Sequence, residues 1–444
     1  MGSTNTSERE LILFNDIEKT DFNATRTQYD HAKKEPAGTL EASSNKIPDG
    51  GFFAWLQVAG AYCIFFNTWG VVNSYGVYQQ YYSSSRLQSH SDSQIAWIGS
   101  MQGFLLLLVS VVTGPLYDAG YLRALVYGGT FLTILGMMIT SICQTYGELL
   151  VAQGIIVGVG DGLLFLPSIV IVSQYFDKKR ALATGIASMG SSIGGVIYPI
   201  VFRQLQPTVG FPWATRVIAF IMLATSAITV PFIKQRVPST SLRKVYDASS
   251  FRDPPYLFFC LGIFFGFMGI YIAFFYVELY ATQVCGMGAR LASYVLAVVN
   301  AGSFFGRLFP NWLADRIGPL NVQIPFALIA SLLAFCWVAI RSTPGLLVFC
   351  ALYGFFSGTF VSLPGPIVYG LSSDMSTVGT RLGMSMGFAG VGLLVGNPIA
   401  GAILRGGGGW VGLQAWAGTL IAVSAGCMMG ARWAKFGGGL RTVS

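Results

Sequence analysis

The sequence has few charged residues and few of the groups that enzymes and metal sites need. Asp, Glu, Lys and Arg make up 10% of the 444 residues, and there are only two histidines, His31 and His90. The seven cysteines show neither CxxC nor Cys/His spacing, so we predict no disulfide framework and no metal site. No Walker-type Gly-Lys-Ser/Thr motif occurs, so we expect no nucleotide cofactor and no direct use of ATP. A catalytic site would need clustered acids, histidines or serines, and only scattered acids are present, so we do not expect an enzyme.

The net charge of +8 does not indicate nucleic-acid binding either. The longest basic run is Lys178-Lys179-Arg180, and nothing in the sequence interleaves aromatic and basic residues. The positive charge therefore needs another explanation, which the hydrophobic pattern provides.

What the chain has in quantity is hydrophobic length. Mean hydropathy is +0.60, and about twelve hydrophobic segments of roughly 20 residues run from Phe52 to Trp433. A helix of that length crosses the ~30 Å hydrocarbon core of a bilayer, where every backbone amide needs an internal partner. We predict an all-α polytopic membrane protein with twelve transmembrane helices in two six-helix halves. The expected spans are 52–76, 94–114, 122–142, 147–173, 181–204, 213–233, 255–280, 291–312, 322–341, 345–369, 382–404 and 410–432.

Polar stretches divide the chain into five parts. We predict a disordered cytosolic tail over residues 1–50, six-helix halves over 51–233 and 255–434, a central cytosolic loop over 234–254 and a short cytosolic tail over 435–444. Lys and Arg are concentrated on the side of this central loop, which predicts that both termini are cytosolic. We expect the plasma membrane as the location, with the vacuolar membrane as the alternative.

The two halves repeat a loop motif. Leu116-Tyr117-Asp118-Ala119-Gly120 follows the second segment, and Leu313-Ala314-Asp315-Arg316-Ile317-Gly318 follows the eighth. An acid beside a glycine turn can accept hydrogen bonds from N–H groups at the next helix start, or pair with a neighbouring arginine. We predict latches formed by Asp118, Asp315 and Arg316 that break when the halves rock. A solvated loop charge is the alternative.

Glycines repeat as well. The fifth and eleventh segments carry glycines at the same spacings: Gly185, Gly190 and Gly194, then Gly387, Gly392 and Gly396. Small residues let membrane helices approach closely, so we interpret all six as the moving contact between the halves. Tandem six-helix halves are typical of transporters that bind their substrate between them.

These features resemble the major facilitator superfamily. The loop motif is similar to its signature, with Ala119 where an arginine is usual and Asn311 where a glycine is usual. A narrower match, Pro48-Asp49-Gly50-Gly51-Phe52-Phe53-Ala54-Trp55, resembles the Asp-Gly-Gly-aromatic-small-Trp signature of the monocarboxylate transporter family, with one extra residue before the tryptophan. The stretches 66–76 and 173–187 are similar to its fungal branch. The resemblance implies the major facilitator fold and a secondary transporter.

The resemblance also implies site residues. Animal members of the family use an arginine, an aspartate and a lysine for carboxylate and proton handling. In this sequence the arginine falls on Arg307, the aspartate on Ser303 and the lysine on Asn73. The comparison therefore implies anion binding at Arg307 but not proton coupling by the family's usual pair.

Three charged residues within the hydrophobic segments are candidates in their own right. Arg307 could bind a carboxylate through its planar guanidinium, or could be a structural arginine that reaches the cytosolic interface. Asp161, in the middle of the fourth segment, is either a proton carrier or an acid hydrogen-bonded to a neighbouring helix. Glu278, near the outer end of the seventh, is either a gating or proton-coupling residue or an interfacial charge.

Uncharged side chains complete the candidate site. Asn73, Asn300 and Ser303 are further candidates for substrate binding, because polar residues in spans either line a cavity or link helices. An aromatic wall or an interfacial belt is predicted from Tyr75, Tyr78, Tyr271 and Phe274.

The leading hypothesis is an alternating-access transporter of a small organic molecule with a carboxylate. Replacement of the family's lysine and aspartate, together with an aromatic, glycine-rich cavity, favours export of a larger, more apolar metabolite. Proton-coupled uptake of a monocarboxylate is the alternative, and a membrane nutrient sensor on a transporter fold is a third reading. The expected partners are the substrate, the lipid bilayer and, if transport is coupled, protons; nucleic acid is not expected. The sequence does not indicate an oligomeric state.

Overall fold

The computed structural model describes residues 49–236, 247–292, 294–372 and 378–437, without the side chains of Asp118, Ile228, Thr229, Ala289 and Arg290. Nearly all of the predicted N-terminal tail, most of the predicted central loop and residues 438–444 therefore lie outside the described residues.

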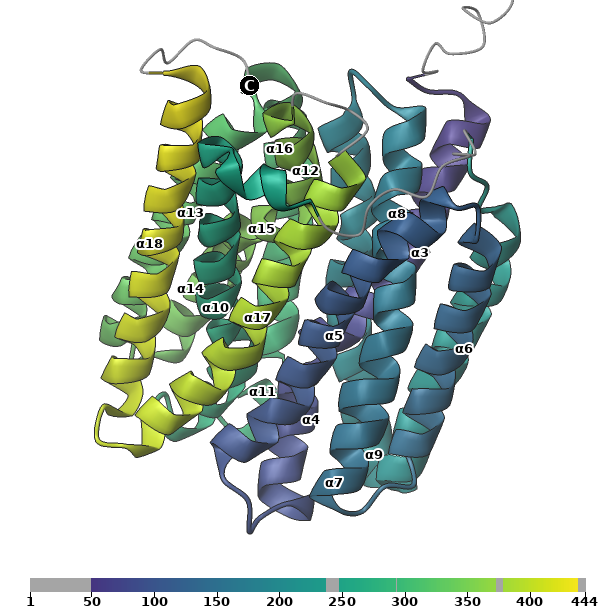
Figure 1. Ribbon diagram of the computed structural model, residues 1–444. Coiled ribbons are helices and arrows are strands. Elements are labelled where there is room, and N and C mark those ends of the chain that lie inside the picture. Colours follow the sequence, from purple (N-terminus) through teal and green to yellow (C-terminus); the bar gives the residue numbers. More distant parts are fainter. Residues whose placement is uncertain (1–48, 237–246, 293, 373–377, 438–444) are drawn as a thin grey trace, which may run out of the picture. The chain divides into compact units, whose positions relative to one another are not determined.

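Every regular element among the described residues is a helix (Figure 1). The first half of the chain forms α3 (Phe52–Asn73), α4 (Tyr75–Tyr81), η1 (Tyr82–Arg86), α5 (Asp92–Asp118), α6 (Leu122–Thr140), α7 (Tyr146–Leu149), η2 (Leu150–Val157), α8 (Gly158–Tyr175), α9 (Arg180–Thr229) and η3 (Val230–Phe232). The second half forms η4 (Ala248–Arg252), α10 (Pro254–Gln283), α11 (Ala289–Ala292), α12 (Val295–Ile317), α13 (Pro319–Cys336), η5 (Trp337–Ala339), α14 (Thr343–Ser357), α15 (Thr359–Ser362), α16 (Pro364–Leu371), α17 (Val378–Arg405) and α18 (Gly409–Phe436).

Helix α9 contains two membrane crossings rather than one. Its 50 residues would measure about 75 Å as one straight helix, far more than the ~30 Å core of a bilayer. Gly210 breaks it with φ 77° and ψ 169°, a conformation that suits glycine, and Pro207 and Pro212 flank the break. The predicted spans 181–204 and 213–233 lie on either side of this break.

The described residues account for twelve crossings. Nine of the described helices are long and apolar enough to cross a membrane by length and composition alone, with α9 counted once. Helices α3 and α12 are not among the nine, although with 22 and 23 residues both are long enough to span. With these two helices, and with α9 divided at Gly210, the predicted twelve-helix, all-α fold is confirmed.

Helix packing follows the repeat. In the first half α9 packs along α3, and α8 packs against α5 and α6. In the second half α10 packs along α17 and α18, and α12 packs along α14. Between the halves, α5 lies along α17 and α9 lies along α12. Figure 1 shows α5 and α17 side by side in the middle of the bundle. The second helix of each half therefore contacts the fifth helix of the other half.

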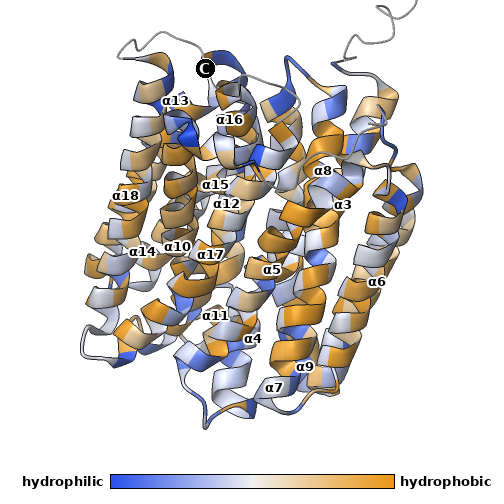
Figure 2. Cartoon of the chain, in the orientation of Figure 1, coloured by the Kyte–Doolittle hydropathy of each residue, from blue (hydrophilic) through white to orange (hydrophobic). Residues whose placement is uncertain are grey.

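The two sides of the bundle can be told apart by the chain's ends. Because the number of crossings is even, α3 begins and α18 ends on the same side (Figure 1). We call this side the terminal face and the other the opposite face. Apolar colour covers the middle of the helices in Figure 2, and hydrophilic colour gathers toward their ends. Large apolar side chains such as Phe131 and Leu332 are more than half exposed, as expected of a surface that lipid covers.

Candidate transport site

Arg307 lies between the two halves, on the face of α12 that contacts α9. It is 1% exposed, its Nε donates to Ser303 Oγ at 3.2 Å, and its Nη1 donates to the Ser188 carbonyl at 2.7 Å and to Ser191 Oγ. Within the described part of the chain no carboxylate pairs with Arg307, and its Nη2 makes no hydrogen bond. The described partners of the positive charge are thus all neutral, and the Nη2 group remains available to bind a further acceptor.

The other predicted binding residues gather along the same stretch of α9. Asn73 Nδ2 lies 3.5 Å from the Ser191 carbonyl, and Tyr271 Oη lies 3.5 Å from Asn73 Oδ1, so both contacts are long for hydrogen bonds. Asn300 donates to the Gly195 carbonyl at 3.1 Å, while its buried Oδ1 has no partner among the described residues. The structure therefore brings Asn73, Asn300, Ser303 and Arg307 against one helix of the first half.

Sequence reasoning missed Ser188, Ser191 and Trp69. The two serines are three residues apart on a helix and hence on one face, a signal that the surrounding glycines concealed. Trp69 is one turn before Asn73 and stacks on Tyr271, with ring centroids 5.8 Å apart and an interplanar angle of 25°. Its buried Nε1 has no partner within the described residues. Tyr271, predicted only as part of an aromatic wall, thus lies between Trp69 and the polar cluster.

Asp161 lies inside the first half, away from the contact with the second. It is fully buried; its Oδ2 accepts from Gln102 of α5 at 3.2 Å, and its Oδ1 accepts from Thr133 of α6 at 3.1 Å. Glycines on either side make this approach possible, since a Cβ at Gly160 would lie 2.5 Å from Thr133 Oγ1. Of the two predicted readings, this geometry favours the acid that links neighbouring helices.

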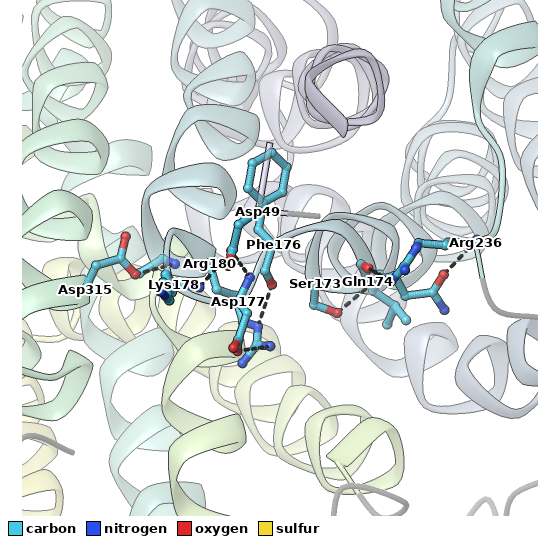
Figure 3. A network of polar contacts seen from close by, with 11 residues as sticks. Asp49, Ser173, Gln174, Phe176, Asp177, Lys178, Arg180, Arg236 and Asp315 are labelled. Atoms are coloured by element: carbon cyan, nitrogen blue, oxygen red, sulfur yellow. Dashed lines mark hydrogen bonds and ion pairs between the residues drawn. The ribbon is translucent and has the colours of Figure 1, made fainter. Parts of the chain in front are cut away.

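A polar network joins the halves at the terminal face (Figure 3). Asp315, in the last turn of α12, accepts from the backbone N–H groups of Ala181 and Leu182, each at 2.9 Å. These amides begin α9, where helix N–H groups lack partners and the helix dipole favours an anion. The acid therefore binds a helix start in the other half, which corrects the prediction that its partner is the next helix start along the chain or the neighbouring Arg316.

Arg316, the other predicted latch residue of the second half, takes no part in this contact. The guanidinium of Arg316 lies over the ring of Trp312 on its own helix, 3.8 Å from the centroid. The side chain of Asp118 lies outside the described residues. Arg180 supplies a further contact between the halves, with its guanidinium 3.5 Å from the centroid of Tyr369 on α16.

Two ion pairs join the halves at the opposite face. Arg203 of α9 pairs with Glu278 of α10, which is 3% exposed, and Arg405 of α17 pairs with Asp92 of α5 at 3.2 Å. The two arginines are 202 residues apart, the same offset that relates Gly185 to Gly387, so they occupy equivalent positions in the repeat. Side-chain contacts therefore join the two halves at both faces, and we call these contacts clasps. Glu278 had been predicted from the sequence, but Arg203, Arg405 and Asp92 had not.

The six repeated glycines have two roles rather than the single predicted one. A Cβ at Gly190 or Gly194 would lie 2.0 or 2.4 Å from a carbonyl of α3, and a Cβ at Gly392 or Gly396 would lie 2.2 or 2.1 Å from a carbonyl of α10. These four glycines thus pack helices within a half. A Cβ at the first glycine of each set would meet the other half: Gly185 faces α12, and Gly387 faces α5. The prediction that all six glycines form a moving contact between the halves is therefore wrong for these four, which pack helices of the same half.

The fold and these clasps define a polytopic membrane protein of two halves that meet around a buried arginine, which is the architecture of a transporter. The chain belongs to the Major Facilitator Superfamily, whose family model matches residues 55–368. It is a multi-pass integral membrane transporter and not an enzyme.

Known proteins resemble the chain over most of its length. The MFS-type transporter dbaD of Emericella nidulans is 43% identical over 378 residues, 85% of each chain. The aspyridones efflux protein apdF of the same organism is 38% identical over 396 residues, 89% of this chain and 81% of that protein. Among solved structures, the Escherichia coli fucose:proton symporter FucP shares the fold, with a TM-score of 0.62 at 18% identity over 85% of this chain and 98% of that one.

Proposed function

We propose that this transporter exports a small organic metabolite that carries a carboxylate, and that Arg307 binds the carboxylate. One observation carries the proposal: a fully buried guanidinium at the contact between α9 and α12 has only neutral partners in the described residues. A charge inside a membrane protein costs at least a few kcal/mol unless it is paired or faces water. A substrate carboxylate would pair with it through Nη2, in the geometry that guanidinium groups favour.

The direction of transport is proposed from the relatives. Two similar proteins bear the name of efflux proteins, for aspyridones and for fujikurins. The stacked pair Trp69 and Tyr271 beside the polar cluster gives an apolar wall that a larger metabolite could contact. Both features support export, and we propose the plasma membrane as the location. The fungal branch of the monocarboxylate porter family remains the proposed subfamily, on the sequence signature alone.

Proton-coupled uptake is the second candidate function. It needs an acid where the halves separate, and Glu278 is such an acid, since it pairs with Arg203 of the other half. Asp161 is less suited, because its described partners all belong to its own half. We propose Glu278 as the proton-coupling residue if transport proves to be coupled.

Alternating access then follows from the two sets of contacts. Opening toward the terminal face separates Asp315 from the first amides of α9, and opening toward the opposite face separates Arg203 from Glu278 and Arg405 from Asp92. Helix α9 takes part at both faces, through the amides that bind Asp315 and through the pair of Arg203 with Glu278.

Flux measurements in sealed vesicles test the proposal. Labelled organic acids and their methyl esters would be followed in both directions, with and without a pH gradient, for wild type, Arg307→Ala and Arg316→Gln. The proposal predicts outward flux of an acid that Arg307→Ala abolishes and Arg316→Gln, a change of the same residue type on the same helix, preserves. Normal flux by Arg307→Ala would make the arginine structural. Inward flux that requires the gradient would favour uptake.

A further inference from the structure

The short segment before α3 binds the turn between α8 and α9 (Figure 3). Asp49 Oδ1 accepts from the backbone N–H groups of Asp177 at 2.6 Å and Lys178 at 2.8 Å, and the N–H of Asp49 donates to the Tyr175 carbonyl at 3.1 Å. Asp49 has φ 52°, a conformation that Asp and Asn tolerate better than most residues. The backbone is thus held in an uncommon conformation that directs the carboxylate at this turn.

A second carboxylate binds the other end of the same turn. Asp315 accepts from Ala181 and Leu182, only three residues beyond the amides that Asp49 binds. Arg180 connects the two sites: its Nε donates to the Phe176 carbonyl at 3.2 Å, and its Nη2 pairs with Asp177 at 3.1 Å. Four backbone amides in six residues are therefore bound by two acids, one from the segment before α3 and one from the second half.

We propose that Asp49 is a positioning residue for the transport cycle: it holds the turn over residues 176–180 so that the first amides of α9 face Asp315. A turn without side-chain support can rotate, and the two amides of α9 would then lose their shared alignment with the Asp315 oxygens. Asp49 thereby stabilises the state in which α9 and α12 meet at the terminal face. The Asp-Gly-Gly-aromatic-small-Trp signature that begins at Asp49 would then act on the contact between α9 and α12 at the terminal face and not on the substrate.

Hydrogen–deuterium exchange of the full-length protein in lipid nanodiscs tests this inference without any substrate. The amides of Ala181 and Leu182 make no bond to Asp49, so their exchange reports positioning rather than direct contact. In Asp49→Gly, which removes the acceptor but tolerates the positive φ, their exchange should rise about tenfold, the effect of one weakened hydrogen bond. Asp49→Asn keeps Oδ1 as an acceptor and should restore most of the protection.

Glu148 provides a matched control. One of its oxygens also accepts from two backbone amides, Gln144 at 2.6 Å and Thr145 at 3.1 Å, but on the opposite face and within the first half. Glu148→Ala should speed exchange at those two amides and leave Ala181 and Leu182 unchanged.

Two outcomes would overturn the inference. One is faster exchange at residues 177 and 178 in Asp49→Gly with no change at Ala181 and Leu182, which would make Asp49 a local cap. The other comes from Asp315→Asn, which also serves if Asp49→Gly does not fold. Coupling is reciprocal, so this variant should speed exchange at residues 177 and 178, and unchanged rates there would contradict the proposal.

Discussion

Replacing either arginine of the two ion pairs at the opposite face by glutamine should favour opening of that face, but by different amounts. Arg203 and Arg405 hold equivalent positions in the repeat and each binds an acid of the other half. Their surroundings differ: the Glu278 side chain is 3% exposed and the Arg405 side chain is 54% exposed. The second carboxylate oxygen of Glu278 has no partner within the described residues, so this acid depends on Arg203. Replacing Arg203 by Gln therefore leaves a buried charge without its counter-ion.

The free-energy cost of each substitution follows from how deeply its ion pair is buried. Removing one partner of a buried ion pair costs about 3–5 kcal/mol, and the partial exposure of Arg203 reduces this to about 2–3 kcal/mol. An exposed pair such as Arg405 with Asp92 contributes about 0–1 kcal/mol. The difference of about 2 kcal/mol corresponds to a roughly thirtyfold difference in the equilibrium between the clasped and the open opposite face.

Distance measurements by pulsed electron resonance would test this prediction. Spin labels at the exposed residues Thr208, beside the Gly210 break in α9, and Gln283, at the opposite-face end of α10, report whether that face is open. In Arg203→Gln the population with a long distance should rise strongly, and in Arg405→Gln it should change less than fivefold. Equal shifts in the two variants, or a larger shift in Arg405→Gln, would refute the reasoning from burial.

Three further predictions concern the rest of the site. Asp315→Asn replaces one of two accepting oxygens by a donor, so it should favour opening of the terminal face by about 1–2 kcal/mol in labelled-distance measurements, whereas Arg316→Gln should have no effect. Gly190→Ala should destabilise the protein by about 1–3 kcal/mol in detergent unfolding, because its Cβ would lie 2.0 Å from a carbonyl. Gly387→Ala is the control and should be tolerated, because the nearest atom to its Cβ would lie 3.4 Å away. Equal losses of stability in the two variants would contradict the packing argument. Asp161→Asn should lower stability by about 1–2 kcal/mol and leave the pH dependence of flux unchanged; loss of that dependence would make it a proton carrier.

Hydrophobic length was sufficient to predict the fold. Segment length against bilayer thickness predicts the twelve crossings directly, and the repeated loop motif and glycines predict two halves. Neither argument depends on knowing which helix packs against which, and this is why both could be made from the sequence.

The roles of the glycines could have been separated by helical geometry. Gly190 and Gly194 are four residues apart and share a face, whereas Gly185 lies about 140° around the helix from Gly190 at 100° per residue. The same angle separates Gly387 from Gly392. One set of glycines therefore cannot all face one partner, and the structure places them against two.

The partners of the charged residues could not be predicted in this way. Asp315 binds amides more than 130 residues earlier in the chain, and Arg307 binds Ser188 and Ser191 at a similar separation. Such pairs depend on how α9 and α12 are rotated against each other, for which one sequence carries no local signal. A candidate residue can thus be chosen from the sequence because a charge inside the membrane is energetically costly, but its partner can be identified only from the structure.

The most direct test of the central claim is the affinity of the transporter for an exported acid and for the methyl ester of the same compound, measured by equilibrium binding to wild type and Arg307→Gln. Charged hydrogen bonds contribute about 1.5–3 kcal/mol, so wild type should bind the acid at least about tenfold more tightly than the ester. Arg307→Gln should bind the two alike. An unchanged preference for the acid in Arg307→Gln, or the absence of any preference in wild type, would contradict carboxylate binding at Arg307.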